Sequence, residues 1–221
     1  MSEQEGVIKF KQELKERQPL KLRDLRELDS WRRIFYQTGL IGQNIKRYNG
    51  AGYGNLSQRL DQHEYPIKKR RFVITGSQTS HLTHLTERHY STVLEYYTNK
   101  NLVIAEGPIK VSSESMTHGT IYDLDNETKF VFHSHSPEIW GCSKKLKIPT
   151  TREIVEYGTP EMADEMRRLY TDTNVKDLHI FSMGGHQDGI FTFGKTSEEA
   201  GLLMLKYLAK SIQLKPQKSL I

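Results

Sequence analysis

Two histidines, His133 and His135, are separated by one residue at the end of an apolar run that starts at Phe130. Side chains two positions apart on a β-strand point to the same face, so both imidazoles can converge on one point. Such convergence suits a metal ion, but a histidine on an apolar strand can equally be a hydrogen-bonded structural residue. From this pair alone, a metal site and a structural role stay equally open.

A third histidine, His186, lies in the glycine-rich segment 183–189, between two expected strands. Glycines permit close backbone packing around a site. Three neutral imidazoles that leave coordination positions open are typical of catalytic zinc sites. Spacing along the chain does not by itself bring His186 to His133 and His135.

One acidic residue, Glu114, follows Ser112 and Ser113 and precedes His118 by one helical turn. An acid near a helix N-terminus ordinarily interacts favourably with the helix dipole. By that argument alone, a catalytic role for Glu114 is the minority interpretation.

Alternating helix and strand signals predict a single α/β domain that must position these residues. Helices are expected over 2–17 (charged and loosely tethered), 22–38, 113–124 with Ser113 as N-cap, 159–170 with Thr159 as N-cap, and 196–212 with a capping box of Thr196 and Glu199. Strands are expected over 55–60, 71–75, 92–97, 102–105, 130–134, 178–183 and 189–193.

The composition predicts a folded protein without a membrane span. Its 221 residues are 36% hydrophobic and 27% charged, and no apolar run approaches the roughly 18 residues that cross a bilayer. The single cysteine, Cys142, cannot form an internal disulfide, which fits a reducing compartment. We therefore expect a cytoplasmic protein.

The formal net charge of +5 points to an anionic partner, which could be a phosphorylated metabolite, nucleic acid or a membrane surface. The densest basic run is Lys68–Arg71. No aromatic-interleaved motif accompanies it, so we interpret it as a solvated hairpin end and not as a nucleic-acid site.

The order of the motifs resembles the class II aldolase/adducin family, which includes fuculose-phosphate aldolase. The resemblance covers about residues 22–212 and rests on five segments: Gly54–Ser57, Val73–Ser77, Ser112–Glu114 with His118, Phe132–Pro137 and His186–Gly194. It implies a three-layer α/β/α fold around a largely antiparallel sheet. The domain would span residues 21–213, with an N-terminal extension over 1–20 and a C-terminal tail over 214–221. It also implies a homotetramer with active sites between subunits.

Carried over to this sequence, the resemblance implies that His133, His135 and His186 bind zinc or another divalent cation such as Mn²⁺, Co²⁺ or Fe²⁺. Glu114 would be the general acid/base, while the cation would hold substrate oxygens and stabilise an enediolate. A phosphate group would be held by Gly54, Asn55, Thr75, Ser77, Ser112 and Ser113.

The expected function is therefore a metal-dependent lyase that cleaves a small, phosphorylated hydroxy-carbonyl compound. Epimerisation and dehydration begin with the same chemistry and stay open as alternatives. A noncatalytic interaction module, as in adducin heads, is the rival from another class, but those heads lose the metal-site residues that this sequence keeps. The segment 148–161 is shorter than in sugar-phosphate aldolases, where it carries a proton-donating tyrosine. Tyr157 lies there, and we interpret it as a packing residue.

Overall fold

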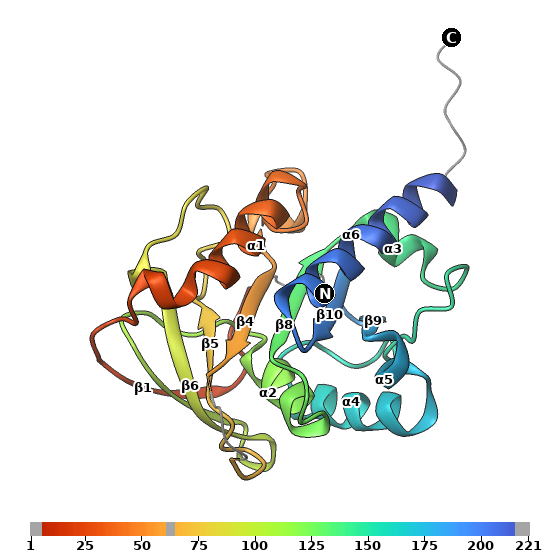
Figure 1. Cartoon of the computed structure of the whole chain (residues 1–221). Helices are drawn as coiled ribbons and strands as arrows, with labels where there is room; N and C mark the ends of the chain where they lie inside the picture. The colour runs from red at the N-terminus through yellow and green to blue at the C-terminus, as the bar shows by residue number, and fades with distance from the viewer. Residues whose placement is uncertain (1–5, 61–64, 215–221) are drawn as a thin grey trace.

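A computed structural model describes residues 6–60 and 65–214, and its centre is an eight-stranded sheet (Figure 1). The strands are β1 (Lys11–Lys15), β4 (Asn55–Arg59), β5 (Phe72–Thr75), β6 (Tyr90–Tyr97), β7 (Leu102–Glu106), β8 (Phe130–His135), β9 (Ile180–Ser182) and β10 (Gly189–Gly194). Their order across the sheet is β1-β7-β6-β5-β4-β8-β10-β9. Every neighbouring pair is antiparallel except β1 with β7.

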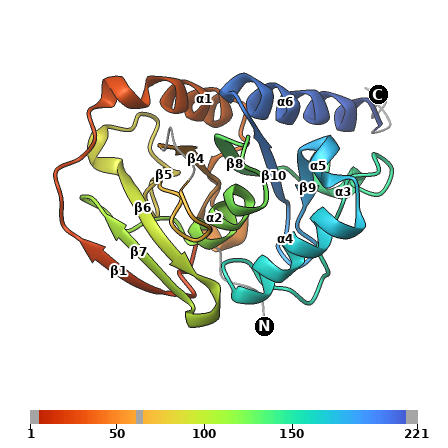
Figure 2. The ribbon, with the colours of Figure 1, turned by 60° about the horizontal axis from the view of Figure 1, so that its bottom comes forward.

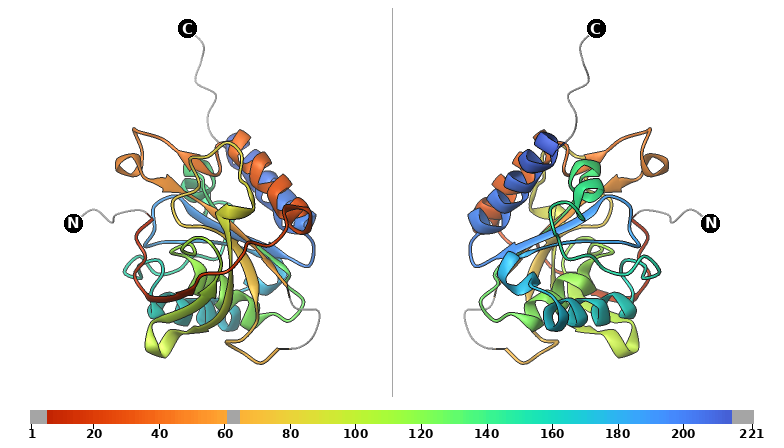
Figure 3. Two further views of the ribbon diagram at one scale, coloured as in Figure 1. Left: turned by 90° about the vertical axis from the view of Figure 1, so that its left-hand side faces the viewer. Right: turned by 90° about the vertical axis from the view of Figure 1, so that its right-hand side faces the viewer.

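Helices cover both faces of the sheet, as Figures 2 and 3 show. One face carries α1 (Arg26–Gln37) and α6 (Ser197–Leu214), with α3 (Pro137–Cys142) beside α6; the other carries α2 (Ser115–Leu124), α4 (Pro160–Asp172) and α5 (Val175–Leu178). Each face has its own hydrophobic core. The expected three-layer α/β/α architecture with a largely antiparallel sheet is confirmed. No helix in the described part of the chain is long and apolar enough to cross a membrane.

Strand β8 shows how the sequence assigns side chains to the two layers. Phe130 and Phe132 belong to the core beneath α1 and α6, where Phe132 packs edge-on against Phe35 with ring centroids 5.5 Å apart. Val131 belongs to the opposite core. Because side chains alternate along a strand, His133 and His135 share the face of Val131.

Most expected elements agree with the structure to within a few residues. Two short strands, β2 (Gly42–Gln43) and β3 (Gly52–Tyr53), form a separate ribbon that was not expected. Thr159 caps α4 as expected by accepting a hydrogen bond from Met162 N. Ser113 is not the N-cap of α2, because that helix begins one residue later than expected, with Glu114 at the cap position. The Thr196–Glu199 capping box is half formed. Thr196 Oγ1 accepts a hydrogen bond from Glu199 N at 3.1 Å, but the Glu199 carboxylate accepts from Lys195 N at 2.8 Å and not from Thr196 N.

The charged helix expected over residues 2–17 is wrong within the described chain, and residues 1–5 lie outside it. Residues 11–15 form β1, an edge strand that pairs with β7. Phe10 is buried and Ile8 packs against the same core. These two side chains, two positions apart, anchor the segment in the extended conformation that the unpaired edge of β7 can bind.

The basic run Lys68–Arg71 contributes to the packing of the sheet against α2. Arg70 is buried, and its guanidinium donates to Tyr122 O and Asn126 Oδ1. Lys68 N donates to Asp123 Oδ1 at 3.0 Å. Residues 61–64, which precede this run in the expected hairpin, lie outside the described chain. Arg70 is therefore a buried structural residue, and the interpretation of the run as a solvated hairpin end is wrong for this residue.

The packing of the N-terminal segment gives a stability prediction. Replacing Phe10 with alanine should lower the free energy of unfolding by about 3 kcal/mol, because a buried aromatic side chain is lost from the core. Replacing Leu14, which is 36% exposed on β1, should cost less than about 1 kcal/mol. Urea denaturation of both variants measures the difference. Equal and negligible effects would contradict the docking of this segment.

Candidate metal centre

Three buried imidazoles converge on the α2 side of the sheet. His133 and His135 come from β8, and His186 comes from the turn between β9 and β10. One nitrogen from each ring lies within 4.8 Å of the other two, and the Nε2 atoms of His133 and His135 are 3.2 Å apart. All three side chains are at most 2% exposed. The structure thus brings together the three histidines that the resemblance selected.

Strand pairing explains how His186 reaches the pair on β8. Gly189, at the start of β10, is opposite His135 in the sheet. The turn is closed by Met183 N donating to Gly189 O at 2.9 Å and by Gly189 N donating to His186 O at 3.0 Å. A Cβ on Gly185 would lie 2.2 Å from Val155 O. The glycine lets the turn pack tightly against the loop that follows α3.

The hydrogen bonds and burial of the rings favour metal ligation. His133 Nδ1 faces Ile190 O at 3.3 Å, so this nitrogen carries the proton and Nε2 presents its lone pair to the cluster. Burial, with the nearby His186 as a second cause, lowers the pKa of both His133 and His135 well below the ordinary value. The neutral imidazole that results is the form that binds metal ions.

The spacing also fits a tetrahedral ion. Nitrogens about 2.0–2.1 Å from zinc at tetrahedral angles are roughly 3.3 Å apart. The 3.2 Å between His133 Nε2 and His135 Nε2 meets that requirement, and a nitrogen of His186 lies within 4.8 Å of both. A tetrahedral ion held by three imidazoles would keep one coordination position open.

Glu114 faces this cluster and not solvent. It is 2% exposed, and its Oε1 lies 3.9 Å from His186 Nε2. Its other oxygen, Oε2, accepts a hydrogen bond from Thr117 Oγ1 at 2.8 Å. One carboxylate oxygen is thus held by the helix while the other lies beside His186, one of the three converging histidines.

A narrow pocket lies beside Ser112 and Ser113, which precede Glu114 in the chain, and its free volume is about 20 Å³, enough for about one water molecule. Its lining includes five of the six residues expected to hold phosphate: Gly54, Asn55, Ser77, Ser112 and Ser113. The sixth, Thr75, is outside this lining and accepts a hydrogen bond from Leu56 N at 3.3 Å. Gly54 also has a backbone role, because its φ is +82° and a Cβ there would lie 2.6 Å from Ile41 Cγ1.

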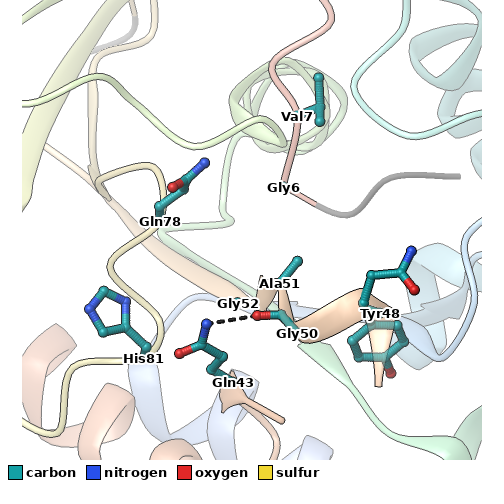
Figure 4. Close-up of a pocket in the computed structure, with 10 residues that line it drawn as sticks. Gly6, Val7, Gln43, Tyr48, Gly50, Ala51, Gly52, Gln78 and His81 are labelled. Atoms are coloured by element: carbon teal, nitrogen blue, oxygen red, sulfur yellow. Dashed lines mark hydrogen bonds between the residues drawn. The ribbon is translucent and has the colours of Figure 1, made fainter. Parts of the chain in front are cut away.

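A wider cleft of about 550 Å³ shares Gly6, Gly52 and Gln78 with the narrow pocket (Figure 4). Its side chains are mainly polar, and they include the amides of Gln43 and Gln78. Gln43 Nε2 donates to Gly50 O at 2.7 Å. The cleft therefore offers hydrogen-bonding groups without strong charge.

Sequence reasoning missed Tyr48 and Asp188 beside the histidines, whereas it named Tyr157 as a packing residue. The Tyr48 ring packs edge-on against His135 at 4.8 Å, and its hydroxyl donates to Asp188 Oδ2 at 2.6 Å. Tyr157 packs against His186 with ring centroids 4.4 Å apart. No local pattern marks Tyr48, whereas the polar stretch 76–79 does signal the loop beside the narrow pocket.

The sequence profile described as "Class II Aldolase and Adducin N-terminal domain" matches residues 44–213. The chain belongs to this family. The matched region includes all three histidines and Glu114. It starts after β1 and α1, so those two elements lie outside the part that the family profile describes.

Solved structures agree on the fold of this family member. YgbL from Escherichia coli has a TM-score of 0.63 and 16% identity, with 88% of this chain and 89% of that chain covered. L-fuculose-1-phosphate aldolase from Thermus thermophilus has a TM-score of 0.61 and 19% identity, covering 87% and 93%. A sugar-phosphate aldolase from Thermotoga maritima has a TM-score of 0.61 and 16% identity, with 87% of this chain and 95% of that chain covered. No curated protein matches the sequence.

Metal analysis of purified protein tests the histidine set. The wild-type protein should retain about one divalent ion per chain after dialysis, and His186→Ala should retain far less because one of three ligands is gone. His84→Ala is the matched control, since His84 is exposed and outside the cluster. Full metal content in His186→Ala, or an equal loss in both variants, would contradict the assignment.

Proposed function

We propose that the protein is a divalent-metal-dependent lyase of the class II aldolase type, acting on a small, phosphorylated hydroxy-carbonyl compound. The observation that carries this proposal is the buried carboxylate of Glu114 beside His186, in a group of three converging imidazoles. Burying this many ionisable groups together is costly for folding and has little structural benefit. Such a cluster is expected where chemistry requires it.

His133, His135 and His186 would hold zinc or a similar cation, which supplies Lewis-acid polarisation of substrate oxygens. Glu114 would remove a proton from the substrate and return it at the end of the reaction. The hydrogen bond from Thr117 Oγ1 fixes one oxygen of Glu114, which would hold the carboxylate in a single orientation beside the histidines. Burial keeps bulk water away from the reacting atoms.

The narrow pocket, with room for about one water-sized group, would take an oxygen at the anionic end of the substrate, and the wider cleft would take the rest. Hydroxyl, amide and backbone donors line the narrow pocket, which suits an oxyanion. Aldol cleavage and a phosphorylated substrate are further supported by the names of two fold neighbours, a fuculose-phosphate aldolase and a sugar-phosphate aldolase.

We also propose that the chain assembles into a homotetramer, as the family resemblance implies. Two loops beside the site carry nearly bare isoleucines: Ile45 is 87% exposed and Ile154 is 86% exposed. Apolar side chains this exposed favour burial against another subunit. Light scattering should give a mass above the 25.7 kDa of one chain, and a fully active monomer would contradict the assembly.

The role of Glu114 is tested with Glu114→Gln, which keeps size and shape and removes the titratable group. Turnover should fall by about 10²- to 10⁴-fold, the usual contribution of a positioned acid or base. Metal content and folding should persist. The measurements are turnover on a panel of phosphorylated ketoses, together with metal analysis and thermal unfolding.

Glu198→Gln is the control, since Glu198 is an exposed acid in the first turn of α6. Its loss should remove only a helix-dipole interaction of roughly 0.3–1 kcal/mol and leave turnover intact. If Glu114→Gln behaves in the same way, with metal bound and turnover near normal, Glu114 has no part in the reaction.

A further inference from the structure

A chain of buried hydrogen bonds leads from the protein interior to the narrow pocket. Tyr122 Oη lies 2.7 Å from Ser57 Oγ, and Ser57 Oγ lies 2.7 Å from His118 Nδ1. On the far side of the imidazole, His118 Nε2 lies 2.7 Å from Asn55 Oδ1. His118 is fully buried and is not one of the three converging histidines. The chain ends at Asn55, which lines the narrow pocket.

The chemistry of these atoms sets the direction of the chain. A carbonyl oxygen only accepts, so His118 Nε2 must carry a proton to bond with Asn55 Oδ1. Burial lowers the pKa of His118 to about 3, so the ring is neutral and Nδ1 must accept from Ser57. Tyr122 can then donate to Ser57. In the reverse direction, His118 would donate to Ser57 and Ser57 to Tyr122. The Tyr122 hydroxyl would then donate to Lys129 O across a long contact of 3.4 Å.

With Oδ1 bound to His118, the opposite end of the Asn55 amide is available to the pocket. The side chain is 7% exposed, and Nδ2 donates to no acceptor within residues 6–60 and 65–214. The backbone amides of Gln78, Thr79 and Ser80 also lack acceptors within these ranges and belong to the same lining. The pocket is therefore lined by two separate segments whose N–H groups have no acceptor in the described part of the chain.

The orientation of this amide matters because the lining residues among those described carry no charged side chain. An oxyanion in the pocket depends on neutral donors alone. A reversed Asn55 amide would place a carbonyl oxygen against the anion and replace attraction by repulsion. A hydrogen bond to a charged group contributes enough to change affinity by roughly 10- to 100-fold.

We infer that His118 is a positioning residue, which locks the Asn55 amide with Nδ2 toward the pocket and so makes the pocket selective for an oxyanion of the substrate. The inference rests on the proposed function for the identity of the bound molecule. The oxyanion could be a phosphoryl group or a carboxylate, which present the same acceptors to these donors. The two are separated by titrating inorganic phosphate and acetate.

The tautomer of His118 is tested on the unmodified holoenzyme by long-range ¹H–¹⁵N NMR correlation. Protonated Nε2 and unprotonated Nδ1 are expected. A ring protonated on Nδ1 alone would require Asn55 Nδ2 to face His118 and would overturn the inference. This measurement needs no variant, so it applies even if substitutions at His118 fail to fold.

The affinity of the pocket for anions tests whether His118 orients the Asn55 amide. The wild-type holoenzyme should bind phosphate or acetate in calorimetric titration, and His118→Phe should bind the same anion about 10- to 100-fold more weakly. Phenylalanine keeps a ring between Phe72 and Phe191, which flank His118. His118→Gln is the conservative variant, because its amide N–H can still donate to Asn55 Oδ1, and affinity should return to within about threefold.

A double-mutant cycle with Asn55→Ala separates positioning from general damage. If His118 acts through Asn55, His118→Phe should have no further effect on anion affinity once Asn55 is alanine. Equal losses in both backgrounds, or a wild-type holoenzyme that binds neither anion, would overturn the inference. The Glu114→Gln result is independent, since loss of the proposed chemistry would leave this cycle unchanged.

Discussion

The burial of three imidazoles within ligand distance of one another is the constraint on which the rest of the site depends. A gap of 3.2 Å between His133 Nε2 and His135 Nε2 brings two polar nitrogens together among buried side chains. One cation could satisfy such a group of nitrogens, provided that their lone pairs face one another. The contact from His133 Nδ1 to Ile190 O meets this condition for His133.

The antiparallel centre of the sheet delivers the other parts of the site. Strand β8 lies between β4 and β10, so His133 is opposite Asn55 on one side and Phe191 on the other. The same pairing places Gly189 opposite His135 and folds His186 back over the site. Helix α2 then presents Glu114 at its N-cap position. The groups for which we propose catalytic, metal-binding and anion-binding roles thus come from four neighbouring elements on one face of the sheet.

The alternation of β8 and its His-x-His geometry could be predicted from local pattern, because side chains two apart on a strand share a face. The approach of His186 could not, since it depends on pairing between β8 and β10; the family resemblance supplied it. The N-terminal strand was missed because its charged sequence resembles a surface helix, while its conformation is set by the free edge of β7 and by Phe10. Tyr48 and Asp188 meet only through tertiary folding, 140 residues apart, and neither has a local signature.

X-ray absorption spectroscopy at the edge of the bound metal tests the central claim most directly, because it reports ligand type and distance without requiring a substrate. The account predicts a single divalent ion with nitrogen and oxygen ligands only, at about 2.0–2.1 Å if the ion is zinc, and with the multiple-scattering pattern of three imidazoles. A spectrum dominated by sulfur, a spectrum without imidazole scattering, or a protein purified without any stoichiometric metal and unable to take one up would contradict it.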